Sequence, residues 1–121
     1  MADIKYQVSY IRVGSSDLDK AKHFYEEILE LPLITQNIEA GYLLFNLAGI
    51  TLIVEKPSEE NNELCPCRYL GISLKVQDIF DIYEKFTNLG VKFIHTPEKQ
   101  FWGGYLTEFE DPDGNVWTLL E

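Results

Sequence analysis

The most constraining feature of this sequence is that it repeats itself. A shift of 63 residues places residues 41–44 (GYLL) over residues 104–107 (GYLT). The ends of the two halves also match in type, ITLIVE at 50–55 against VWTLLE at 116–121. A repeat of this kind indicates one supersecondary unit used twice, because a single copy cannot bury its own hydrophobic face.

Each half is predicted to contain, in order, one strand, one helix and three further strands. Alternating apolar residues indicate the strands, and apolar residues at helical spacing indicate the helices. We expect Ser16 to cap the first helix and Gly90 to end the second in a left-handed conformation. The predicted elements are strands 6–13, 32–39, 41–47 and 50–55 around helix 15–31, then strands 69–76, 91–96, 104–110 and 115–121 around helix 77–90.

The predicted fold class is therefore α+β. Two βαβββ repeats, about 5–56 and 68–121, are joined by a polar linker at 57–67, and together they make one domain over residues 1–121. A helix covers only one face of each half, so we expect the copies to form a curved eight-stranded mixed sheet around a cleft.

Composition excludes several classes of partner. The net charge is -10, and phosphate binding needs a concentrated basic surface, so nucleic acid is not expected. No apolar run is long enough to span a membrane, and the polar start, MADIKYQ, indicates no secretory signal. We expect a cytoplasmic location, where Cys65 and Cys67 stay reduced; a metal clamp built on them would need further ligands.

Two stretches carry a resemblance to a known family. They are the entry RV…DL…FYEEILEL and the exit FWGGYLTEFEDPDGNVWTLLE. With the repeat and the length, they resemble the vicinal oxygen chelate superfamily, which includes glyoxalase I, bleomycin resistance proteins and extradiol dioxygenases. The resemblance implies paired βαβββ modules and a homodimer. One departure is Glu30, where the family usually has glycine, so the first helix must end differently.

In enzymes of that superfamily, four strands each supply one ligand to a divalent metal. The corresponding positions here are Val8, Thr51, Gly71 and Thr118. Two of them have no side-chain donor atom, and two have neutral hydroxyls, which are weak ligands without carboxylate or imidazole company. We therefore expect no metal and no cofactor, with the cleft kept and the metal site lost.

Period-two alternation sorts the residues that would line the cleft instead. Two carboxylates are not expected under a helix, so Glu108 and Glu110 should face the cleft or water. The shift of 63 makes Phe45 the counterpart of Glu108. The resulting ligand-binding candidates are Tyr10, Arg12, Phe45, Ser73, Trp102, Leu106, Glu108 and Thr118.

Most of these residues have a structural interpretation as well. Trp102 is either a ligand contact, as in similar bleomycin-resistance-like proteins, or a core or dimer contact. Glu108 is either a general base or the partner of Arg12 or Lys75 in a salt bridge. Arg12 clamps an anionic ligand group or forms a structural ion pair. His23 is expected on the surface, and His95, at a strand end, is a weak catalytic candidate.

Four functions remain open. The favoured one is a metal-free protein that binds a small molecule, with a cationic or aromatic compound as the ligand. The others are a metal-dependent lyase or isomerase of the glyoxalase I type, a metal-free enzyme that uses Glu108 as base, and an interaction domain whose cleft is filled by side chains.

Overall fold

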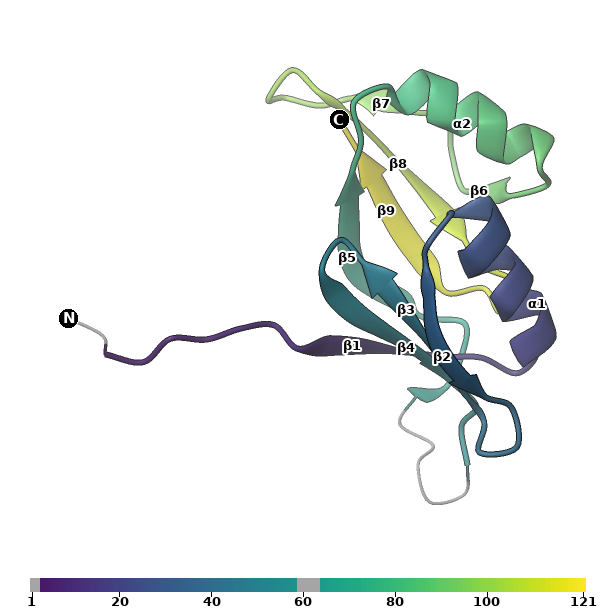
Figure 1. Ribbon diagram of the computed structural model, residues 1–121. Helices are drawn as coiled ribbons and strands as arrows, with labels where there is room; N and C mark the ends of the chain where they lie inside the picture. Colours follow the sequence, from purple (N-terminus) through teal and green to yellow (C-terminus); the bar gives the residue numbers. More distant parts are fainter. Residues whose placement is uncertain (1–2, 59–63) are drawn as a thin grey trace. The chain divides into compact units, whose positions relative to one another are not determined.

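The computed structural model describes residues 3–58 and 64–121 of the chain. They fall into two compact units, Met1–Leu64 and Cys65–Glu121. The boundary lies inside the predicted linker, and each unit contains one copy of the repeat (Figure 1). The α+β class and the two βαβββ units are confirmed. Where one eight-stranded sheet was expected, hydrogen bonds join the described strands into two sheets, one in each unit.

The first unit contains a four-stranded sheet in the order β1-β4-β3-β2. Strand β1 runs parallel to β4, and the other neighbours are antiparallel. The first helical segment covers one face, where the ring of Tyr25 lies 5.8 Å from that of Phe45. The strands are β1 (Tyr10–Gly14), β2 (Leu33–Asn37), β3 (Tyr42–Leu47) and β4 (Ile50–Glu55).

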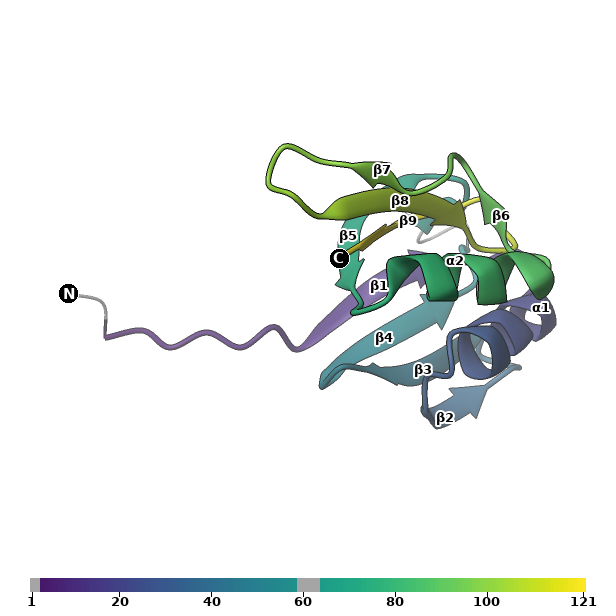
Figure 2. The ribbon, with the colours of Figure 1, turned by 90° about the horizontal axis from the view of Figure 1, so that it is seen from above.

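The first strand begins later than predicted. Residues 6–13 were expected to be strand, but β1 starts at Tyr10, and residues 3–9 extend away from the sheet (Figure 2). Their alternation of apolar and polar residues is real, yet Ile4, Tyr6 and Val8 are all exposed. Alternation alone predicted a strand here, but pairing with β4 stops near Ser9, whose carbonyl accepts from the Thr51 amide at 3.3 Å.

The first helix also differs from its prediction. It begins with α1 (Leu18–Lys22) and continues as a π-helix, η1 (His23–Ile28). The predicted Ser16 cap is wrong, because the Asp17 carboxylate accepts from the amides of Asp19 and Lys20. The wider turn of a π-helix buries both Phe24 and Tyr25, which are neighbours in sequence.

The first helix ends just before Glu30, where the sequence led us to expect a different kind of ending. Glu30 has a φ of 58°, the left-handed conformation for which the family usually supplies glycine. A side chain at such a position costs about 1 kcal/mol relative to an ordinary backbone conformation. The helix therefore ends in the conformation that glycine would take, so the expected difference in its ending is wrong, and Glu30 takes the strain.

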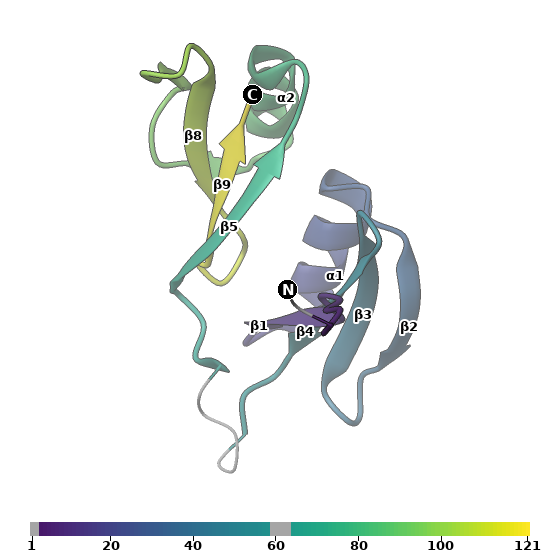
Figure 3. The same ribbon diagram turned by 90° about the vertical axis from the view of Figure 1, so that its left-hand side faces the viewer.

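The second unit contains a sheet in the order β5-β9-β8-β6, with β7 also paired to β8. Helix α2 (Ile79–Asn88) covers one face, as Figure 3 shows, and its Phe86 ring lies 5.8 Å from that of Phe109. The predicted left-handed Gly90 is confirmed at a φ of 91°. The strands are β5 (Tyr69–Lys75), β6 (Lys92–Phe93), β7 (Glu98–Lys99), β8 (Tyr105–Glu110) and β9 (Val116–Leu120).

The predicted strand 91–96 is interrupted after two residues. β6 ends at Phe93, where the Ile94 amide still donates to the Glu108 carbonyl at 2.9 Å, and the next strand paired with β8 is β7. Pro97 has no amide hydrogen to give to a sheet, which accounts for part of the break. The residues between the two short strands include His95, whose side chain turns to β8 and enters the site described below.

Candidate functional site

One face of the second sheet is buried under α2, and the other face carries polar side chains. Along β8, Thr107 and Phe109 are fully buried on the side covered by α2. Leu106 and Glu108, which alternate with these two residues along the strand, therefore point to the other face, as the alternation predicts for Glu108. We call the residues Tyr69, His95, Glu108 and Thr118 on and beside this uncovered face the polar row of the second unit.

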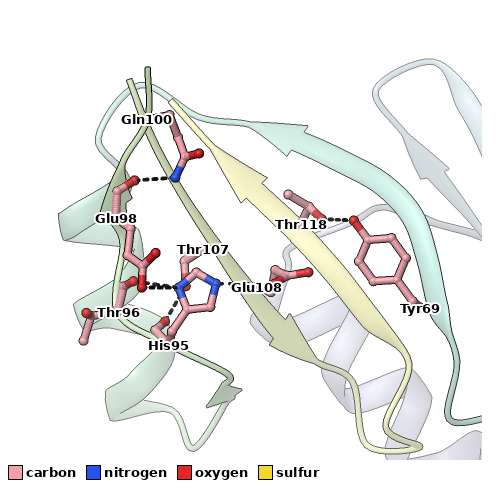
Figure 4. A network of polar contacts seen from close by, with 8 residues as sticks. All are labelled: Tyr69, His95, Thr96, Glu98, Gln100, Thr107, Glu108 and Thr118. Carbon is pink, nitrogen blue, oxygen red and sulfur yellow. Dashed lines mark hydrogen bonds and ion pairs between the residues drawn. The ribbon is translucent and has the colours of Figure 1, made fainter. Parts of the chain in front are cut away.

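His95 and Glu108 make the central contact of the polar row (Figure 4). The His95 Nε2 atom lies 3.3 Å from a Glu108 carboxylate oxygen, and Nδ1 lies 2.8 Å from the carbonyl oxygen of Thr96. Nδ1 is also 3.8 Å from the Glu98 carboxylate. The Thr107 hydroxyl donates to the backbone carbonyl of His95, which fixes the histidine against β8. Both side chains of the central pair are about one quarter exposed.

These contacts determine the charge that His95 prefers. The hydrogen bond to the Thr96 carbonyl is the largest effect that raises the pKa of His95 above its ordinary value of 6.5, and burial opposes it. The hydrogen bond to Glu108 and the charges of Glu98 and Glu108 raise the pKa further. A neighbouring carboxylate favours the imidazolium form because it stabilises the positive charge.

Thr118 extends the polar row onto the next strand. It lies directly opposite Glu108 in the β8–β9 pairing and opposite Ser73 in the β5–β9 pairing. Its hydroxyl is 3.3 Å from the Tyr69 hydroxyl, while most of the Tyr69 side chain is exposed. Figure 4 shows Glu108 between His95 on one side and the Thr118–Tyr69 pair on the other.

Gly71 lies in a distortion of β5 beside this row. The strand advances four residues, from Tyr69 to Ser73, while β9 advances two, from Val116 to Thr118. Gly71 takes a φ of 70° inside this bulge, a conformation that other residues adopt only with strain. At Gly71, one of the four positions that the resemblance matches to metal ligands, the backbone therefore favours glycine, and histidine or glutamate would cost about 1 kcal/mol of strain.

The first unit has its own uncovered face. Tyr10 pairs with Thr51 in the β1–β4 register, and Arg12 pairs with Ile53. The Arg12 Nε atom donates to a Glu55 carboxylate oxygen at 2.7 Å, so Arg12 takes part in an ion pair. Val8 lies before β1 and is 65% exposed.

Two sequence-based expectations need correction here. Pairing with Arg12 or Lys75 was one of the two alternatives for Glu108, but Arg12 contacts Glu55 and Glu108 contacts His95. The predicted orientation of Phe45 is also wrong, because its side chain is fully buried against Tyr25 under the first helix.

The error over Phe45 is a register error of one residue. Strand pairing places Asn46 opposite Thr51 and Glu108 opposite Thr118, so Asn46 and not Phe45 is the counterpart of Glu108. In a strand, a shift of one residue moves a side chain to the opposite face. Aligning the GYLL and GYLT stretches therefore assigned the residues that follow them to the wrong face of the strand.

Trp102 lies in the turn between β7 and β8, which projects beyond the sheet in Figure 2. It is 49% exposed and contacts Phe101 edge to face at 5.3 Å. Gly104 makes this turn possible, since a Cβ atom there would lie 2.1 Å from the Glu121 carbonyl oxygen and 2.6 Å from the Trp102 Nε1 atom. The indole thus rests against bare backbone.

Sequence reasoning gave too little weight to His95 and did not select Tyr69. The register between β6 and β8 reveals the proximity of His95 to Glu108, and an interrupted strand hides that register in the sequence. His23 lies on the surface, as expected, beside Glu27. Cys65 and Cys67 are exposed, and the described residues contain no group of three His, Cys, Asp or Glu side chains placed to hold a metal.

Comparison with known proteins gives consistent relatives over the whole length. The sequence is 30% identical to the uncharacterized protein YetH of Bacillus subtilis, over 95% of this chain and 98% of that one. It is 26% identical to a bleomycin resistance protein of Klebsiella pneumoniae (88% and 86% covered). It is 22% identical to the metallothiol transferase FosB of Lysinibacillus sphaericus (89% and 77% covered).

Solved structures agree with these sequence relatives. A glyoxalase/bleomycin resistance protein/dioxygenase superfamily member from Sphaerobacter thermophilus has a TM-score of 0.84 and 32% identity, with 98% of both chains covered. TnmS3, an antibiotic binding protein from Streptomyces, has a TM-score of 0.77 and 26% identity, with 98% of this chain and 97% of that chain covered.

No helix among the described residues is long and apolar enough to cross a membrane.

The sequence profile of the Glyoxalase/Bleomycin resistance protein/Dioxygenase superfamily matches residues 7–119. With the two βαβββ units and relatives that cover the chain, this match leads to one conclusion: the chain belongs to the glyoxalase/bleomycin resistance protein/dioxygenase superfamily.

Proposed function

We propose that this protein binds a small organic molecule without a metal, and that the ligand is an aromatic or cationic compound which it sequesters. The observation that carries the proposal is the polar row of the second unit. It combines a partly exposed carboxylate with an exposed tyrosine, whose hydroxyl contacts the buried Thr118 hydroxyl, on a sheet face that α2 leaves uncovered. A few polar groups beside apolar surface are the usual composition of a small-molecule site.

The residues at the four ligand positions support the metal-free part of the proposal. Val8, Thr51, Gly71 and Thr118 provide at most two neutral hydroxyls. Gly71 adds a backbone argument, because its positive φ favours a residue without a side chain. Divalent transition metals in proteins need carboxylate, imidazole or thiolate ligands, and these positions offer none.

Two of the relatives support a small organic molecule as the class of ligand. One is named as a bleomycin resistance protein and another as an antibiotic binding protein. The net charge of -10 favours the approach of a cation, and Trp102 and Tyr69 offer exposed rings on which an aromatic cation can stack. We include a homodimer in the proposal, which light scattering of the purified protein would measure.

Thermal shift with metal-free bleomycin, ethidium and berberine tests the proposal. A compound at a hundred times its Kd adds about 2.7 kcal/mol to the free energy of unfolding, so the Tm rises by several degrees. Trp117 is fully buried and Trp102 is half-exposed, so quenching of tryptophan fluorescence should disappear in Trp102→Phe. No shift and no quenching with any of the three compounds would contradict the proposal.

The same samples test the metal-dependent alternative. We expect EDTA to leave both the Tm and the ligand-induced shift unchanged, and methylglyoxal with glutathione to show no turnover. Stoichiometric Zn or Ni in protein purified without chelators, lost together with the Tm on adding EDTA, would overturn the metal-free interpretation and favour a lyase or isomerase.

One observation favours a metal-free enzyme as the second candidate. The His95–Glu108 pair holds a proton at the edge of the polar row, and general acid–base catalysis needs such a group. This candidate predicts that Glu108→Gln abolishes turnover of a substrate that the unsubstituted protein converts. If turnover survives Glu108→Gln, Glu108 is not the base.

A further inference from the structure

The ring of His95 is surrounded by groups that only accept hydrogen bonds. Nδ1 faces the Thr96 carbonyl at 2.8 Å, and Nε2 faces the Glu108 carboxylate at 3.3 Å. A neutral imidazole has a single N–H and can satisfy only one of these acceptors, whereas an imidazolium donates to both. The geometry therefore favours a positively charged His95, and the direction of its pKa change agrees.

The charged groups around Glu108 come from several strands. His95 approaches from the segment between β6 and β7, and Glu98 of β7 faces the other ring nitrogen. The next carboxylate along the same face of β8, Glu110, has its own partner, since Lys92 of β6 lies 3.3 Å away. From β9 and β5 come the neutral hydroxyls of Thr118 and Tyr69. Among the described residues, His95 is the cation paired with Glu108.

Loss of the His95 proton would leave Glu108 without that cation. The carboxylate is only about one quarter exposed, and a partly buried charge without a partner is unfavourable. A positive group from outside would restore the pairing. Beside Glu108, the exposed ring of Tyr69, whose hydroxyl contacts the buried Thr118 hydroxyl, suits an organic ammonium, guanidinium or aromatic cation.

We infer that His95 is an internal competitor for the ligand: its imidazolium occupies the carboxylate of Glu108 that an organic cation pairs with when it binds. This inference rests on the proposed binding function and adds a specificity-determining residue to it. Binding of a cation is then coupled to loss of one proton from His95. Affinity rises with pH, by up to about tenfold per pH unit while His95 is mostly protonated.

The test uses ethidium and berberine, whose positive charges are permanent, so that any pH dependence comes from the protein. Their Kd is measured by fluorescence between pH 5.5 and 8.5 on the full chain. We expect the Kd of the unsubstituted protein to fall as the pH rises. In His95→Gln, the Kd should be independent of pH and should match or improve on the value of the unsubstituted protein at high pH.

Two further variants complete the test. His23→Gln changes the other histidine, on the exposed side of the first helix, and should keep the full pH dependence. Glu108→Gln should weaken binding at high pH and lose the pH dependence. Circular dichroism and a cooperative urea transition establish that each variant is folded.

Failure of this inference can be told apart from failure of the proposed function. Binding with the same Kd at every pH, or a pH dependence that persists in His95→Gln, overturns the role of His95 but leaves the binding function standing. Absence of binding by both compounds at every pH contradicts both. A Kd that rises with pH in the unsubstituted protein reverses the predicted coupling and also overturns the inference.

Discussion

Among single residues, the two histidines of this chain make an informative pair. The His23 Nδ1 atom contacts the Glu27 carboxylate one helical turn away, and both side chains are about two-thirds exposed. His95 is held between two strands, a backbone carbonyl and two carboxylates. The same residue type therefore has a solvated surface role in the first unit and a fixed, charge-bearing position in the second.

The raised pKa of His95 predicts how stability depends on pH. A group whose pKa is higher in the folded state stabilises that state fully below its unfolded value, about 6.5, and the contribution is lost as the pH rises through the folded pKa. We expect the free energy of unfolding to fall over that window, measured by urea denaturation. His95→Gln should flatten this part of the profile, and His23→Gln should not. An unchanged slope in His95→Gln would rule out His95 as its source.

At the level of elements, the face of each strand decides which residues are structural. Phe45 and Leu44 are neighbours on β3, but Phe45 is fully buried under the first helix and Leu44 is only partly buried on the other face. In β8, Phe109 likewise points to its helix and Glu108 away from it. In each unit, buried core residues therefore alternate along the strand with residues on the face away from the helix.

This assignment predicts a contrast between neighbouring substitutions. Phe45→Ala should lower the free energy of unfolding by about 3–5 kcal/mol, because it leaves a cavity beside Tyr25. Leu44→Ala, the matched control on the opposite face, should cost clearly less. Both are measured by urea denaturation. Equal costs, or a larger one for Leu44→Ala, would mean that the faces of β3 are assigned the wrong way round.

The elements that the sequence predicted well are those with a strong periodic signal. Helix α2 and strands β3, β4, β8 and β9 fall close to their expected places, and Gly90 ends its helix as glycine at that position should. The π-helix could not be predicted, because Phe24 and Tyr25 fit one apolar face only once the turn widens. Residues 3–9 alternate like a strand, but a partner strand is needed to make one.

The site was less accessible to sequence reasoning than the fold. Glu108 and Thr118 could be placed on one face from alternation, and they are opposite one another in the sheet. His95 could not be assigned to them, because the break between β6 and β7 hides its register with β8. Phe45 was misplaced because the two GYL stretches align one residue out of step with the strand pairing.

For the whole molecule, the dominant physical property is charge. The chain has twenty acidic and ten basic residues, and the ion pairs within the described residues involve only a few of them. A net charge of -10 destabilises a compact state through self-repulsion and draws cations toward the surface. Both effects act over distances comparable to the Debye length, about 10 Å at 0.1 M salt.

Ionic strength should therefore act in opposite directions on stability and on binding. Between 0.02 and about 0.3 M NaCl, we expect the Tm to rise by a few degrees as repulsion is screened. Over the same range the Kd for ethidium should also rise, because attraction of the cation is screened. An equal osmolarity of glucose serves as the control and should leave the Kd unchanged. A Tm that falls with NaCl would contradict this account of the charge.

The bulge at Gly71 has a consequence for anyone who wishes to engineer metal chemistry into this scaffold. Histidine or glutamate at Val8, Thr51, Gly71 and Thr118 would supply donors, but at position 71 the left-handed backbone would add strain of about 1 kcal/mol, as it does at Glu30. A donor placed there would also sit inside the irregular β5–β9 register, so shortening β5 is a second edit that such a design would have to weigh.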